Sequence, residues 1–138
     1  IAVLRIEGEN LPTAPVGSST DLVIGEWVMA IGNPYSYLLG NSEPTVTAGV
    51  VSAVGRDLIP SGDNSGVYVG MIQTDAPITS GSSGGSLVDA DGALIGITTA
   101  VGVSNIGVEG IGFATPVEIV ERVTNEIIAT GSVSHDCC

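Results

Sequence analysis

Apolar and β-branched residues occur along most of the chain in runs of strand length, separated by glycine, proline and other turn formers. Such runs predict short β-strands joined by tight turns. We expect six or seven strands, within residues 1–6, 26–31, 45–54, 67–73, 87–88, 93–99 and 111–114. The connections are too short for parallel crossovers, so the pattern predicts an all-β fold, an antiparallel β-barrel.

Two local patterns add detail to this barrel. The sequence DADG at residues 89–92 separates two apolar runs, and Asp-Gly at such a position predicts a hairpin turn. We interpret Asp89 and Asp91, like Asp21, as turn or cap residues. Trp27 and Phe113 are expected in the core.

One helix is predicted after the last strand. Thr115 suits the N-cap, Pro116 the first helical position, and Glu118 completes a capping box, while Gly131 is the expected stop. Between them, apolar residues recur at helical spacing: Val117, Val120, Val123, Ile127 and Ile128.

Composition and charge exclude several classes of protein. The chain has 138 residues, of which 43% are hydrophobic and 20 are glycine, which fits one compact β domain. It has no lysine and carries a net charge of −12, which argues against nucleic acid and anionic lipid as partners. No apolar run is long enough for a transmembrane helix. The acidic residues show no metal-ligand spacing and no Cys/His cluster exists, so we predict no metal and no cofactor.

The sequence GSSGGSL at residues 81–87 is the most informative segment. Serine and glycine are common in flexible turns, and the run alone is compatible with nothing more. Alternatively it is a nucleophile loop, in which glycines let the main chain approach a substrate carbonyl and backbone N–H groups form an oxyanion hole.

The wider sequence favours the nucleophile loop. Residues 81–87 resemble the Gly-Asn-Ser-Gly-Gly-Pro/Ala-Leu signature of the HtrA (DegP-like) family of trypsin-like serine proteases. Further segments similar to the family follow in its order and spacing: residues 28–34, 45–56, 72–76, 92–100 and 110–116. The resemblance covers roughly residues 1–130 and implies the C-terminal half of the protease domain, its second six-stranded antiparallel barrel.

The resemblance implies roles for individual residues. Ser83 matches the nucleophile that forms the acyl-enzyme, and the N–H groups of Gly81 and Ser83 match the oxyanion hole. Ser82 and Ser86 depart from the usual asparagine and proline or alanine. Both are small and polar, which is compatible with the turn.

The substrate pocket follows from the same resemblance. Its walls correspond to four residues: Ile78, Thr99, Ala100 and Val101. These walls are small and apolar and include no acidic residue. The implied preference is for small aliphatic residues before the scissile bond, not for Lys or Arg.

The catalytic base and its orienting acid are not apparent. The family supplies a histidine from its N-terminal barrel and an aspartate directly before the strand that corresponds to residues 1–6 here. The only histidine, His135, follows the predicted helix stop, and we interpret it as an exposed tail residue. Asp75 is interpreted as structural.

We expect the chain to begin at a boundary inside a longer protein. We also expect the adjacent Cys137 and Cys138 to be free or paired outside this chain.

Two hypotheses remain open at this stage. In the first, the parent protein is a serine endopeptidase completed by the missing N-terminal barrel, and this fragment alone is inactive. In the second, the chain is an inactive fragment or pseudoprotease that binds extended peptides by β-addition. The resemblance further implies unfolded polypeptide substrates and an extracytoplasmic location, and it leaves open a PDZ domain after residue 138 and a homotrimer. It divides the chain into residues 1–131, barrel plus helix, and 132–138, an exit linker or tail.

Overall fold

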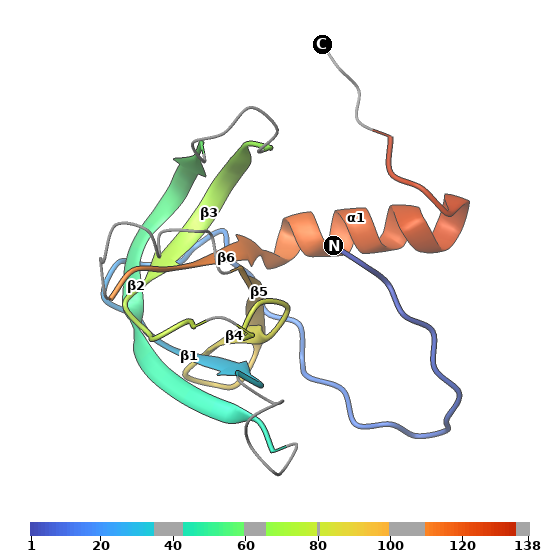
Figure 1. The fold of residues 1–138 in the computed structure, drawn as a ribbon, viewed down its shortest axis with the longest axis horizontal. Helices are drawn as coiled ribbons and strands as arrows, with labels where there is room; N and C mark the ends of the chain where they lie inside the picture. The colour runs from blue at the N-terminus through green and yellow to red at the C-terminus, as the bar shows by residue number, and fades with distance from the viewer. Residues whose placement is uncertain (35–42, 60–65, 80, 100–109, 135–138) are drawn as a thin grey trace.

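Six strands are followed by one helix in a computed structural model that describes residues 1–34, 43–59, 66–79, 81–99 and 110–134 (Figure 1). The strands and helix are β1 (Trp27–Gly32), β2 (Thr45–Leu58), β3 (Tyr68–Thr74), β4 (Ser86–Asp89), β5 (Leu94–Thr99), β6 (Gly112–Pro116) and α1 (Val117–Thr130).

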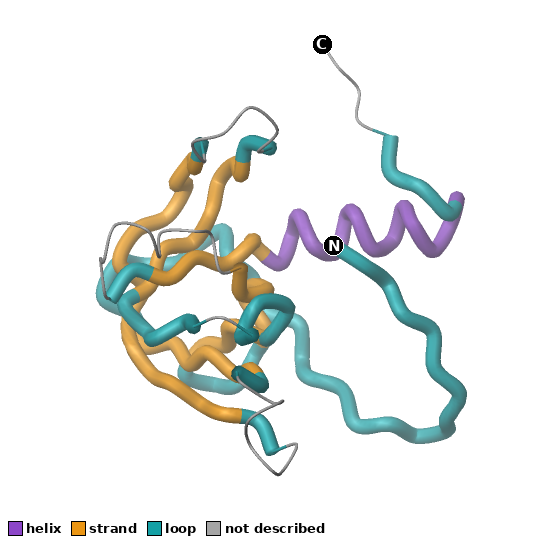
Figure 2. The backbone as a smooth tube through the Cα atoms, viewed as in Figure 1, coloured by secondary structure: helices purple, strands orange, loops and turns teal. Residues whose placement is uncertain are grey.

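The strands form a closed barrel in the order β1-β2-β3-β6-β5-β4, and all pairings are antiparallel. Figure 2 shows the strands arranged around a common interior. Alternate residues point inward, as the period of a β-strand requires. Among the described residues, side chains from all six strands, together with Ala76 after β3, form a core cluster of eight buried residues: Val28, Ala30, Val51, Ile72, Ala76, Leu87, Ile95 and Ala114. The predicted antiparallel barrel is confirmed.

The predicted hairpin between β4 and β5 is also present. The Asp89 Oδ1 atom accepts hydrogen bonds from the N–H groups of Asp91 (2.9 Å) and Ala93 (2.8 Å). Gly92 has a φ of 81°, a conformation that residues with a side chain rarely adopt. The turn is therefore specified by the local sequence.

The helix begins at Val117, and its N-terminus differs from the prediction. Pro116 is the N-cap residue, and no side chain caps the first turn. The predicted capping box is wrong because Thr115 belongs to β6 and Glu118 bonds a distant segment instead. Glu118 accepts hydrogen bonds from Ser18 Oγ (3.0 Å), from the Ser19 N–H (2.8 Å) and from Ser19 Oγ.

These bonds change the acidity of Glu118. Burial raises the pKa of this carboxyl, but the hydrogen bonds from Ser19 and Ser18, together with a backbone bond at Glu118 itself, outweigh it. The net pKa lies below the ordinary value of 4.5. The charged form of Glu118 thus ties the start of the helix to the segment that leads into the barrel.

At its other end the helix stops as predicted. Gly131 adopts the left-handed conformation with a φ of 82°, and its N–H donates to the Ile127 carbonyl at 2.8 Å. Figure 1 shows the helix projecting away from the barrel. Val117 is buried, Val120, Val123 and Ile127 are half-buried, and Ile128 is 69% exposed, so the apolar face is fully buried only in the first turn.

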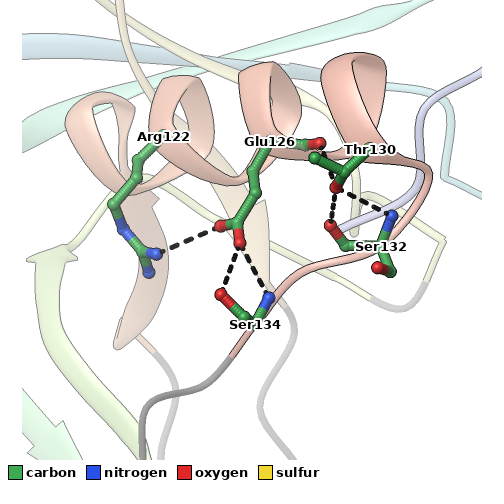
Figure 3. A network of polar contacts seen from close by, with 5 residues as sticks. All are labelled: Arg122, Glu126, Thr130, Ser132 and Ser134. Carbon is green, nitrogen blue, oxygen red and sulfur yellow. Dashed lines mark hydrogen bonds and ion pairs between the residues drawn. The ribbon is translucent and has the colours of Figure 1, made fainter.

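Polar contacts hold the segment that follows the helix (Figure 3). The Glu126 Oε1 atom accepts hydrogen bonds from Ser134 N (2.7 Å) and Ser134 Oγ (2.9 Å). Arg122 lies 3.7 Å from the other carboxylate oxygen of Glu126. Thr130 Oγ1 lies 2.9 Å from the Glu126 carbonyl and 2.8 Å from the Ser132 carbonyl.

Two further predictions are wrong. Residues 1–6 form no strand, because they pair with no neighbour in the described part of the chain. The segment before β1 meets the barrel further along, where Val16 forms an isolated bridge with Leu94. Trp27 is not in the core but 68% exposed, since it starts β1 on the outward face. Phe113, by contrast, is buried as expected.

Candidate active site

The predicted nucleophile loop lies between β3 and β4. Ser83 is exposed, and it lies between two glycines with positive φ, Gly81 at 93° and Gly84 at 85°. A residue with a Cβ is strained in that region of conformational space. The two glycines therefore allow the tight turn that presents Ser83 at the surface.

Hydrogen bonds to β5 hold this turn in place. Ser82 is buried, and its carbonyl accepts hydrogen bonds from Thr98 Oγ1 (2.5 Å) and from the Gly85 N–H (3.0 Å). Its N–H donates to the Thr79 carbonyl at 2.9 Å. The main chain of Thr98 adds two bonds, accepting from the Gly84 N–H and donating to the Gly85 carbonyl, each at 2.8 Å. The peptide groups on both sides of Ser83 are thus fixed.

The end of β1 packs against the same turn. A Cβ added to Gly85 would clash with the carbonyl oxygen of Ile31, and one added to Gly32 would lie 3.1 Å from the Ser82 Cα. Gly85 therefore requires the absence of a side chain, whereas a side chain at Gly32 would press tightly against Ser82. No sequence signal pointed to Gly32 or Thr98 as supports of this loop.

Asp75 has a structural role here, as expected. Its Oδ1 atom accepts a hydrogen bond from the Val50 N–H at 2.7 Å. The neighbouring Gly49 lies so close that a Cβ there would meet this carboxylate and the backbone of Ala76. The carboxylate therefore ties the start of the loop to β2.

Two of the four predicted pocket residues are described. Ile78 is half-buried and packs against the core cluster, and its Cδ1 lies 2.7 Å from where a Gly112 Cβ would be. Thr99 is paired with Phe113 in the sheet, next to Gly112. Ile78 and Thr99 thus lie against the same stretch of β6. The other two predicted residues lie outside the described residues: Ala100 and Val101.

A small cavity of about 170 Å³ lies behind the nucleophile loop. Ser82 and Thr98 line it together with Thr79 and Pro77 and with the end of β1. Neither Ile78 nor Thr99, the described residues of the predicted substrate pocket, contributes to it.

The described residues include no histidine, since the single His135 lies outside them, as do Cys137 and Cys138. In the same ranges no group of three or more His, Cys, Asp or Glu residues is arranged to hold a metal ion. In the described part of the chain, Ser83 therefore lies on a tight turn with no histidine that could act as its base.

Comparison with known proteins identifies the fold. The family model for the trypsin-like peptidase domain matches residues 1–97, which include the nucleophile loop. The chain belongs to the trypsin-like peptidase family. Its resemblance to the HtrA (DegP-like) proteases is confirmed by curated relatives, as follows.

A probable periplasmic serine endoprotease DegP-like of Pseudomonas savastanoi pv. phaseolicola is 41% identical over 135 residues, 98% of this chain and 26% of the relative. A protein of the same description from Chlamydia muridarum is 42% identical over 98% of this chain and 25% of the relative. The trypsin-like chain described here therefore spans about a quarter of the length of these relatives.

Solved structures agree with the assignment. The HtrA-type protease AlgW with tripeptide superposes with a TM-score of 0.79 and 42% identity, over 94% of this chain and 40% of that one. Deg5 superposes with a TM-score of 0.67 and 42% identity, over 87% of this chain and 50% of that one. Within the described ranges, no helix has the length and apolar character needed to cross a membrane.

Proposed function

We propose that the parent protein is a serine endopeptidase and that Ser83 is its nucleophile. The observation that carries the proposal is the exposed position of Ser83 between two positive-φ glycines, on a turn anchored to β5. The Ser83 Oγ atom attacks a peptide carbonyl carbon while its proton passes to a base. The C–N bond then breaks, the leaving amine takes up the proton, and water hydrolyses the acyl ester.

The N–H groups of Gly81 and Ser83 stabilise the oxyanion in this proposal. The positive φ of Gly81 supports this role, because its peptide must adopt a conformation that a side chain disfavours. Removing one such donor from an oxyanion hole costs about 2.7–4 kcal/mol of transition-state stabilisation. Ser82 supports this geometry indirectly, because it is buried and both its N–H and its carbonyl group are hydrogen-bonded.

We further propose that Ile78 and Thr99, with Ala100 and Val101, line the pocket for the residue before the scissile bond. Their small and apolar side chains favour Val, Ala or Ile over charged residues. The half-buried position of Ile78 beside Gly112 supports a narrow, apolar wall.

The base and its orienting acid come from the rest of the parent protein, and this chain alone is inactive. The described residues include no imidazole, and Asp75 is hydrogen-bonded to the backbone of β2. An N-terminal barrel of the parent supplies both groups. In this view residues 1–131 belong to the protease domain and residues 132–138 form an exit linker or tail.

The setting of the parent is extracytoplasmic, and its substrates are unfolded or extended polypeptides. The names of the relatives, which describe periplasmic serine endoproteases, support this location. A downstream PDZ domain and a homotrimer are compatible with relatives about four times as long as this chain. The alternative is a pseudoprotease that captures peptides by β-addition. Each of the six strands in the described part of the chain has a partner on each side in the closed barrel, so none of them supports that alternative as a wholly unpaired strand.

A fluorophosphonate probe tests the proposal, because it reacts with an activated serine. Peptide mapping of the labelled parent should place the adduct on Ser83, and the Ser83→Ala variant should abolish it. Ser86→Ala is the matched control and should still be labelled. We expect this chain alone to react at least about 100-fold more slowly, since it lacks the base. An unlabelled parent would support the pseudoprotease, and rapid labelling of this chain would contradict the missing base.

A further inference from the structure

The exposed Trp27 lies at the end of β1 that faces away from the nucleophile loop. Its side chain is 68% exposed, although tryptophan usually buries most of its surface. The opposite end of the strand, Gly32, packs against Ser82. Five residue steps of extended chain separate Trp27 from Gly32, or about 16 Å. The surface around Trp27 is therefore distinct from the site of Ser83.

Trp27 forms part of a cavity of about 460 Å³. Leu22, Val28 and Ala90 contribute the other apolar walls. Val28 belongs to the core cluster and Leu22 packs against it, so these two walls of the cavity rest on the barrel core. A volume of this size is within the range that holds a small ligand or a large side chain.

The rim of the cavity is acidic. Among the described residues that line it, none is cationic and four carry carboxylates: Asp21, Glu26, Asp89 and Asp91. Two of these carboxylates already accept hydrogen bonds within the chain. Asp89 accepts from N–H groups of its hairpin turn, and Glu26 Oε2 accepts from the Val23 N–H at 3.0 Å. In the described part of the chain, the carboxylates of Asp21 and Asp91 take part in no hydrogen bond or ion pair.

We propose that this cavity binds an arginine side chain carried by an extended segment of a second polypeptide. A guanidinium group stacks on the face of tryptophan and pairs with carboxylates in a fixed fork, so one side chain satisfies both features of the site. The aromatic wall favours this organic cation over a metal ion, and the described residues hold no metal-binding group. The net charge of −12 attracts such a partner over a longer range. This binding site does not depend on the role of Ser83.

The single tryptophan makes the test direct. Because Trp27 is the only tryptophan in the chain, its fluorescence reports binding at this cavity alone. We would titrate the chain with acetyl-Gly-Arg-Gly-amide, and with matched peptides in which citrulline or leucine replaces arginine. The arginine peptide should change the emission saturably, and the neutral citrulline peptide should bind much more weakly. Equal responses to arginine and citrulline, or a stronger response to leucine, would overturn the proposal.

Two double variants that remove the same charge distinguish direct contact with the cavity carboxylates from attraction by the net charge of the chain. Asp21→Asn combined with Asp91→Asn should weaken binding of the arginine peptide roughly tenfold, since each exposed pair contributes a modest energy. Glu7→Gln combined with Glu9→Gln removes the same charge from the exposed N-terminal segment and should change binding less than about twofold. Equal weakening by both double variants would overturn the site.

Discussion

Replacement of Thr98 by valine removes one hydrogen bond beneath the nucleophile loop while keeping the shape of the side chain. Thr98 is only 2% exposed, and its hydroxyl donates to the Ser82 carbonyl at 2.5 Å. The two main-chain bonds between Thr98 and the loop remain in the variant. The substitution therefore isolates the contribution of the hydroxyl.

The expected loss is moderate. A hydrogen bond in a folded protein contributes about 0.5–1.5 kcal/mol, and a buried carbonyl left without a partner costs more. The Ser82 carbonyl still accepts from Gly85 in the variant, so we expect Thr98→Val to lower the free energy of unfolding by about 1 kcal/mol. For a domain of this size, that corresponds to a fall in Tm of roughly 3–5 °C.

Thermal unfolding followed by circular dichroism measures this change, with Thr124→Val as the matched control. Thr124 lies on α1, and its hydroxyl makes no hydrogen bond in the described part of the chain. The control should shift Tm by less than about 1 °C. In the intact parent, Thr98→Val should also slow fluorophosphonate labelling, because the loosened Ser82 peptide precedes Ser83. An unchanged Tm together with an unchanged labelling rate would refute the anchoring role of Thr98.

Four further variants probe the fold. Gly85→Ala should destabilise the chain by about 2–3 kcal/mol in chemical denaturation, because the new methyl group clashes with the β1 backbone. Trp27→Ala should cost less than about 1 kcal/mol, whereas Phe113→Ala should cost about 3–5 kcal/mol, since only Phe113 is buried. Glu118→Gln should remove a pH-dependent part of the stability. The pKa of Glu118 is lowered on folding, so its contribution is present above 4.5 and is lost as the pH falls through the folded pKa.

Matched controls accompany Gly85→Ala and Glu118→Gln, and Trp27→Ala and Phe113→Ala serve as controls for each other. Gly66→Ala places a methyl group in open space and should leave stability nearly unchanged. Glu121→Gln changes an exposed carboxylate on the same helix and should not alter the pH profile. If the Tm difference between Glu118→Gln and the native chain persisted unchanged at pH values well below 4.5, the ionised hydrogen bonds to Ser19 would not be its cause.

Local sequence signals were sufficient for the barrel and its turns. The alternation along β2, the Asp-Gly turn and the helix stop at Gly131 depend on residues close in sequence, and each was predicted. The run around Ser83 was locally compatible with a flexible turn alone, and its interpretation as a nucleophile loop came from the resemblance to the HtrA family.

Features that depend on distant contacts were not predictable. Glu118 matched a local capping box but bonds to Ser18 and Ser19, 100 and 99 residues away. The apolar character of Trp27 suggested burial, although its position at the outward start of β1 leaves it exposed. The support of Ser82 by Thr98 depends on how β5 meets the loop, which no local pattern encodes.

The role of Ser83 is tested most directly by the kcat/KM of the intact parent and its Ser83→Ala variant on a peptide with valine before the scissile bond. Loss of a nucleophile from a serine protease lowers turnover by a factor on the order of 10⁶. We predict a loss of that order, with Ser86→Ala retaining most of the activity. A Ser83→Ala variant that kept more than about one tenth of the native kcat/KM would contradict the assignment of Ser83 as the nucleophile.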